Sequence, residues 1–286
     1  MSGKIILSAD STCDIGSVLA QKYDVKFFNY HILLGDKTYI DMIEIMPEQI
    51  FATWHEQGIL PKTAAINPAE YHEFFKKWVE DGYEVIHLNL GSALSSAHQN
   101  CRAAADELGH VYPVDSESLS SGVAHLVVLA GEMIKEGLSA AEIAERLKAL
   151  RKNVHASFIL NTLEFMRAGG RCNAVTAFSA ELFSIKPCIE VDNAKGGAMG
   201  VGKKYRGSIE VSLEKYIRDK LYGKNNLCLD RIFITHSGSP DSDIELAKTE
   251  ILKYAPFKEI YVTRASGTIS SHCGPRTLGI LFMTND

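Results

Sequence analysis

Short apolar runs alternate with helical patterns along the first half of the chain, and this alternation constrains the fold more than any other feature. Residues 4–9, 85–90 and 111–114 have the composition of strands, and patterns typical of helices lie between and after them. Such alternation predicts a mostly parallel sheet with flanking helices. The pattern resets after Lys152, and a second series of strands and helices follows. We therefore expect an α/β fold of two α/β domains, residues 1–153 and 154–286.

A serine-rich turn follows the central run, where Gly91 ends the expected strand and an alanine-rich helix begins near Ala97. Ligands of parallel α/β sheets bind beyond the carboxyl ends of the strands. The first N–H groups of a helix lack intrahelical partners, and the helix dipole favours an anion there. Serines at such a position also cap helices. The turn at residues 92–96 is therefore a candidate anion site, with capping as the alternative.

Composition excludes several classes of function. A net charge of -5 gives no reason to expect binding to nucleic acid. The apolar run near the N-terminus is too short for a signal peptide, and the longest one, residues 123–130, contains His125 and is too short to span a membrane. We expect a cytoplasmic protein. The six cysteines are scattered without a CxxC pair, so we expect reduced thiols and no metal site.

Residues 197–204 come close to the phosphate-binding loop of nucleotide-binding proteins. That loop needs Ser or Thr after its lysine to hold Mg²⁺, and Lys204 occupies the place. The segment also follows a turn composition where the phosphate-binding loop would follow a buried strand. A glycine-rich hairpin is the better interpretation, and no nucleotide cofactor is expected.

His272 is the most suggestive histidine, because it is placed in a small-residue segment, residues 266–275, that we expect to form a loop facing a cleft. With Ser95 or Ser96 it supplies two members of a serine hydrolase triad. The chain lacks a G-x-S-x-G elbow. Cys172 and Cys273 are possible nucleophiles without an evident partner. From the residues alone, the chemistry ends at an anion-binding cleft.

Several segments occur in a characteristic order and spacing: Ser8-Ala9-Asp10-Ser11-Thr12-Cys13-Asp14, Pro61-Lys62-Thr63-Ala64, Leu94-Ser95-Ser96-Ala97-His98-Gln99, Val114-Asp115-Ser116, Thr162-Leu163-Glu164-Phe165, Gly169-Gly170-Arg171, Ile185-Lys186-Pro187 and His272-Cys273-Gly274-Pro275. In this order they resemble the DegV family of bacterial fatty-acid-binding proteins, essentially from end to end. The family's fold implies two α/β domains with a ligand cleft between them.

The resemblance implies a lipid-binding carrier and not an enzyme. It would hold one long-chain fatty acid, such as palmitate, with the tail in an apolar pocket of the second domain. Thr63 and Ser95 would donate hydroxyl hydrogen bonds to the carboxylate, and Ser96 a backbone N–H. Arg171 and His272 would border the opening for the head group. A separate fatty acid kinase would phosphorylate the bound acid for phospholipid metabolism.

The chain departs from the family pattern at five positions. Ser96, Ala97 and His98 replace the usual Gly, Thr and Tyr of the serine turn, and Cys273 and Arg276 replace the usual residues around the histidine. Arg276 would either approach the carboxylate or face solvent. Two enzymatic or small-ligand alternatives remain: an acyl hydrolase that uses Ser95 and His272, and a kinase-substrate subunit in which His272 binds a small carbonyl compound. An apolar tunnel would argue against the latter.

Overall fold

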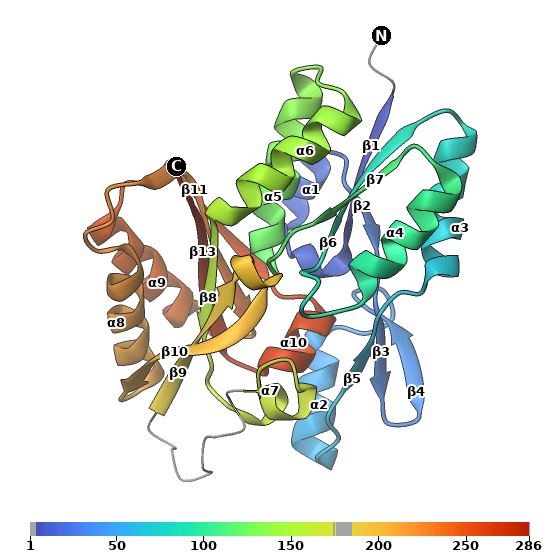
Figure 1. Cartoon of the computed structure of the whole chain (residues 1–286). Coiled ribbons are helices and arrows are strands. Elements are labelled where there is room, and N and C mark those ends of the chain that lie inside the picture. Colours follow the sequence, from blue (N-terminus) through green and yellow to red (C-terminus); the bar gives the residue numbers. More distant parts are fainter. Residues whose placement is uncertain (1–3, 174, 176–184, 286) are drawn as a thin grey trace.

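The first sheet is parallel throughout and is covered by helices on both faces. A computed structural model describes residues 4–173, 175 and 185–285. The strand order is β2-β1-β6-β7. Figure 1 shows α3 and α4 on one face, and α1, α5 and α6 on the other. The bounds are β1 Ile5–Asp10, β2 Lys26–Phe28, β6 Glu84–Asn89, β7 Val111–Asp115, α1 Ser17–Lys22, α3 Pro68–Glu80, α4 Ala97–Leu108, α5 Ser121–Lys135 and α6 Ala140–Leu150.

The second sheet has the order β10-β9-β8-β13-β11-β12, and only β11 and β12 are parallel. Helices α8 and α9 cover one face (Figure 1). The mixed α/β class is as predicted, but this half is mostly antiparallel. The bounds are β8 Val154–Ile159, β9 Ile185–Asp192, β10 Ala198–Arg206, β11 Leu227–Ser237, β12 Glu259–Arg264, β13 Thr277–Thr284, α8 Ile209–Leu221 and α9 Asp241–Tyr254.

A small third sheet has the order β4-β3-β5. The sequence predicts a β-rich run over residues 25–34 and a turn at residues 35–37, but not the pairing of this region with residues 62–64. Residues 61–65, predicted as an extended connector, contain β5 (Lys62–Ala64), which pairs antiparallel with β3 (His31–Leu34). Strand β4 (Lys37–Ile40) pairs with the other edge of β3. The helices α2 (Pro47–Gln57), α7 (Glu164–Gly169) and α10 (Gly267–Cys273) lie beside this sheet (Figure 1).

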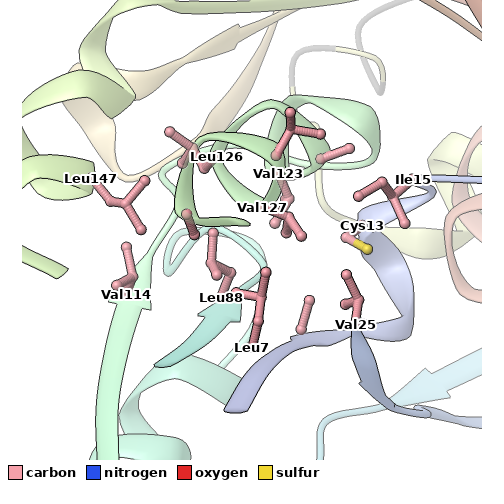
Figure 2. Close-up of a cluster of buried hydrophobic side chains, with 14 of the residues drawn as sticks. Leu7, Cys13, Ile15, Val25, Leu88, Val114, Val123, Leu126, Val127 and Leu147 are labelled. Carbon is pink, nitrogen blue, oxygen red and sulfur yellow. The ribbon is translucent and has the colours of Figure 1, made fainter. Parts of the chain in front are cut away.

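Helix α5 joins the two large sheets into one core. Its apolar side chains pack on Leu7 and Leu88 of the first sheet, as Figure 2 shows, and the same cluster includes Phe233 and Leu281 of the second sheet. A helix that is apolar around its whole circumference is buried on all sides. Within α5, His125 bonds the Leu281 carbonyl at 3.0 Å, and burial lowers the pKa of this histidine to about 4.

Two local predictions are wrong and one is confirmed. The composition of residues 266–275 predicts a loop, but Gly267–Cys273 is helix α10. The glycines among residues 167–171 predict that helical structure ends before Arg167, but α7 continues to Gly169. The glycine-rich hairpin is confirmed by the antiparallel pair of β9 and β10. The helix predicted over residues 174–183 lies outside the described residues apart from Val175.

Across the described residues, no helix combines the length and apolar character needed to cross a bilayer. The same residues contain no group of three or more His, Cys, Asp or Glu side chains arranged to hold a metal ion.

Candidate functional site

One cavity brings together four of the five residues predicted for the site. Thr63 and Ser95 line it from the first half of the chain, and Arg171 and His272 from the second. The space at this site that no protein atom occupies, open solvent at the mouth included, is about 810 Å³.

Thr63 meets His272 because the small third sheet lies against helix α10. Pairing of β5 with β3 places Thr63 opposite Ile32. From α10, the Nε2 atom of His272 lies 2.8 Å from the Thr63 hydroxyl. The two halves of the chain are therefore joined by a side-chain hydrogen bond at the cavity wall.

Two buried carboxylates of the first half hold the start of α10. The Asp41 carboxylate accepts hydrogen bonds from the Gly267 and Thr268 N–H groups at 2.8 and 3.1 Å. Asp14 accepts one from the Ser266 N–H at 2.8 Å. Carboxylates are favoured at helix N-termini because the first N–H groups lack intrahelical partners. The Ser266 hydroxyl also caps α10 by accepting a hydrogen bond from the Ile269 N–H, so local and long-range acceptors together satisfy the start of this helix.

His272 is neutral at physiological pH. Burial, and secondarily the charge of Arg171, lower its pKa to about 4. Its Nδ1 atom is buried and has no hydrogen-bond partner within the described residues. In the tautomer that carries the proton on Nε2, the ring donates to the Thr63 oxygen. The Thr63 proton is then free to bond an acceptor inside the cavity.

Ser95, and not Ser96, caps helix α4 through its side chain. The Ser95 hydroxyl accepts a hydrogen bond from the Ala97 N–H at 3.2 Å. Ser96 occupies the N-cap position without a side-chain cap bond and is exposed. It lies in a shallow depression with His98 and Arg102, outside the cavity that holds the other four residues. A backbone N–H role for Ser96 remains a prediction.

Arg171 supplies a positive charge at this end of the cavity. One of its terminal nitrogens donates to the Gly169 carbonyl at 2.8 Å, and its Nε donates to the Leu94 carbonyl at 3.4 Å. These bonds tie the exposed guanidinium to α7 and to the serine turn. An anion at the cavity mouth would find this charge beside two hydroxyl donors.

The remainder of the lining is largely apolar. Two hydroxyl groups in the wall are bonded to protein neighbours: Ser237 donates to Ser270 at 3.2 Å, and Thr277 to the Cys273 carbonyl at 2.8 Å. The Thr268 hydroxyl, also in the lining, is buried without a hydrogen-bond partner among the described residues. Burial raises the pKa of the Cys273 thiol to about 12, which makes it a poor nucleophile. The apolar lining comes from both halves: Leu90, Leu94, Leu119, Phe158, Met166, Met199, Ile269 and Leu281.

The glycine-rich turn between β9 and β10 closes against the serine turn. The Ala93 N–H donates to the Gly196 carbonyl at 3.0 Å. Gly197 has a φ of +86°, and a Cβ there would lie 2.9 Å from the carbonyl carbon of Glu117. The segment that resembles a phosphate-binding loop is therefore a packing element of the cavity wall.

A buried polar network lies behind Ser95. Its Asp10 belongs to the motif of residues 8–14, while Tyr30 belongs to no segment quoted from the sequence. Tyr30 lines the cavity, and its hydroxyl lies 3.5 Å from the Ser95 oxygen and 3.4 Å from Asp10. Asp10 also accepts hydrogen bonds from Tyr71 and His87. Residues 25–34 match a strand and contain no site motif, so Tyr30 is found only from the structure.

Arg276 takes neither of its two expected positions. It donates two hydrogen bonds to Asp243, at 2.8 and 3.0 Å, and one to Glu210 at 2.7 Å. It does not line the cavity in the described structure. The ion pairs tie the start of β13 to α8 and α9, because Arg276 immediately precedes that strand.

The geometry does not form the serine–histidine pair of a hydrolase. The hydrogen-bond partner of the His272 Nε2 is Thr63, while Ser95 is bonded to Ala97 and Tyr30. A nucleophile and its base should lie within hydrogen-bond reach of each other. The arrangement suits holding a ligand by its polar end.

Fold and site together define an α/β protein with a cavity whose lining combines apolar side chains with hydroxyl, imidazole and guanidinium groups. The chain belongs to the DegV family, because residues 4–285 match the family model described as an uncharacterised protein of that family. A DegV domain-containing protein of Clostridium perfringens is 28% identical over 291 residues, covering 98% of this chain and 97% of that protein.

Solved structures share the fold. A DegV family protein from Thermus thermophilus, described by its fatty acid binding, is 28% identical, with a TM-score of 0.86 over 99% of this chain and 100% of that one. A Thermotoga maritima protein is 24% identical, with a TM-score of 0.84 over 99% of this chain and 100% of that one. The likeness to the second structure shows the fold alone.

Proposed function

We propose that this protein binds one long-chain fatty acid, such as palmitate, with its carboxylate at Thr63 and Ser95. The observation that carries the proposal is the cavity itself, whose lining combines apolar side chains with the Thr63 and Ser95 hydroxyls and the Arg171 guanidinium. The Thermus relative, described by its fatty acid binding, supports the same ligand class.

The polar end matches a carboxylate. A buried carboxylate is stabilised when several donors satisfy its oxygens. Thr63 and Ser95 offer hydroxyl protons, Arg171 offers a charge, and the Ser96 N–H is a further proposed donor. His272 acts as a neutral neighbour that orients Thr63.

The apolar lining matches an acyl tail. Burial of a methylene group from water contributes about 0.8 kcal/mol, so the tail provides most of the affinity and the polar end sets the orientation. A small carbonyl compound bound to His272 would leave this lining unfilled. The missing Ser95–His272 hydrogen bond argues against the hydrolase alternative.

The finer parts of the proposal rest on the family resemblance. The protein would be a cytoplasmic carrier that presents its bound acid to a separate fatty acid kinase for acyl phosphate formation. We place the boundary between two domains near residue 153, where β8 of the second sheet begins.

Ligand analysis of the purified protein tests the proposal. Native mass spectrometry should show a bound acyl chain or, after delipidation, uptake of one palmitate per protein. Absence of both would overturn the proposed function. Hydrolysis of a p-nitrophenyl ester that is lost in Ser95→Ala would instead favour the hydrolase.

A further inference from the structure

We infer that Tyr30 is a positioning residue that directs the Ser95 hydroxyl proton toward the bound carboxylate. The inference rests on the proposed function, and it concerns how the described geometry prepares Ser95 for an anionic ligand. Tyr30 lies on the cavity wall with its hydroxyl 3.5 Å from the Ser95 oxygen.

The Ser95 oxygen has two lone pairs and one proton. The Ala97 N–H, at 3.2 Å, occupies one lone pair. The Tyr30 hydroxyl is placed to occupy the other. With both lone pairs engaged, Ser95 can take part in a further hydrogen bond only as a donor. A carboxylate accepts hydrogen bonds and does not donate them, so this is the state that the ligand requires.

Tyr30 has one proton, and Asp10 competes for it at 3.4 Å. The Asp10 carboxylate already has four other donors. They are the hydroxyl of Tyr71 at 2.7 Å, the Leu90 N–H at 2.9 Å, the His87 Nε2 at 3.0 Å and the Asn89 amide at 3.4 Å. A carboxylate offers about four lone-pair positions. Asp10 therefore does not need the Tyr30 proton, which remains available for Ser95.

The donor role of His87 toward Asp10 follows from its other nitrogen. The His87 Nδ1 lies 2.7 Å from the Ser8 hydroxyl. When Ser8 donates there, the ring carries its proton on Nε2 and donates it to Asp10. This chain of side chains resembles a catalytic triad, but Ser8, His87 and Asp10 are each fully buried and have no route to a substrate. Its effect is to fill hydrogen-bond acceptor positions of the Asp10 carboxylate.

Tyr30 can donate a hydrogen bond only while its phenol is protonated. Burial, followed by the charge of Asp10, raises the pKa of its phenol well above the ordinary value. The Thr63 hydroxyl is arranged in the same way, since His272 can donate a hydrogen bond to its oxygen. Each hydroxyl at the polar end then has a protein donor behind it and a proton to offer the ligand.

A double-mutant cycle with a matched control tests the inference. Tyr30→Phe keeps the ring and removes the hydroxyl. Tyr112→Phe is the control, because its hydroxyl bonds Glu84 at 2.7 Å and neither Asp10 nor Ser95 in the described structure. Palmitate affinity of the delipidated protein would be measured for the wild type, both tyrosine variants, Ser95→Ala and the Tyr30→Phe/Ser95→Ala double variant.

We expect Tyr30→Phe to weaken palmitate binding about 3- to 10-fold, the range of one net hydrogen bond. Tyr112→Phe should bind as the wild type does. The Tyr30→Phe change should have no further effect in the Ser95→Ala background, because its action passes through Ser95. The carboxyl resonance of bound [1-¹³C]palmitate should shift in Tyr30→Phe and not in Tyr112→Phe.

Three results would overturn the inference while the proposed function stands: wild-type affinity in Tyr30→Phe, an equal loss in Tyr112→Phe, or a full Tyr30→Phe effect without Ser95. Wild-type protein that binds no fatty acid would overturn both. A measurement on the wild type guards against misfolding of the variant. With ¹³Cζ-labelled tyrosine, the Tyr30 signal should shift when palmitate is added, and an unmoved signal contradicts the inference.

Discussion

The Thr63 hydroxyl and the His272 Nε2 atom lie 2.8 Å apart, although 209 residues separate them in the chain. This hydrogen bond crosses the cavity wall between β5 and α10. It joins the residue proposed to hold the carboxylate to a histidine that is kept neutral by burial.

Replacing both hydroxyl donors should weaken fatty acid binding while the fold survives. For the Thr63→Ala/Ser95→Ala double variant we expect a loss of about 1–3 kcal/mol per hydrogen bond to the charged group, measured by titration calorimetry with palmitate. Ser92→Ala is the matched control, since Ser92 is exposed on the same turn and does not line the cavity. Unchanged affinity in the double variant would show that the carboxylate binds elsewhere.

Affinity should rise with acyl chain length until the apolar space is filled. Each added methylene is expected to contribute about 0.8 kcal/mol, because it leaves water for the apolar lining. Competition binding with saturated acids from eight carbons upward measures the slope, and the length at which it levels marks the end of the cavity. A flat series would contradict burial of the tail.

His272 should make the protein acid-sensitive. Its folded pKa of about 4 lies below the ordinary histidine value, so the unfolded chain takes up the proton first. The associated stability is present above about pH 6.5 and is lost as the pH falls toward 4. Urea unfolding at pH 7 and pH 5 should show a smaller decrease for His272→Gln than for the wild type. His55→Gln, at an exposed position, should behave as the wild type does.

Asp14 should have the opposite pH dependence. Burial raises its pKa to about 7 in the fold, so the folded protein binds this proton more tightly than the unfolded chain does. Its contribution to stability therefore decreases as the pH rises from about 4 to about 7. Asp14→Asn keeps an acceptor for the Ser266 N–H. Its free energy of unfolding, relative to the wild type, should be higher at pH 8 than at pH 5. Equal differences would refute the assignment, and Asp24→Asn at an exposed site is the control.

Arg276 should matter for stability and not for ligand affinity. Arg276→Ala leaves Asp243 unpaired with its side chain 1% exposed, which we expect to cost about 3–5 kcal/mol in the free energy of unfolding. Glu210→Ala removes a more exposed partner and should cost about 0–1 kcal/mol. Denaturant unfolding and palmitate titration check both parts. A loss of palmitate affinity without a loss of stability would instead show that Arg276 belongs to the binding site.

Local patterns in the sequence are sufficient for the first sheet and most of the helices. The helix expected from Ala97 to Leu108 is α4, with these same limits. Strand and helix periodicity is a property of neighbouring residues, so it can be read without the fold. The order of short motifs also belongs to the linear chain, and it indicates the family for the same reason.

Only the tertiary structure shows which segments of the chain lie next to each other. Strand β3 pairs with β5, and the second sheet is mostly antiparallel. The local sequence pattern of a strand does not indicate which other strand it will pair with. Residues 266–275 look like a loop by composition, yet Gly267–Cys273 is a helix. Its start is capped by Ser266 and also bonded to Asp14 and Asp41, which lie more than 200 positions away in the chain. Tyr30 meets Ser95, 65 positions away, through another long-range contact. The chain specifies its elements by periodicity, but contacts between distant residues build the site.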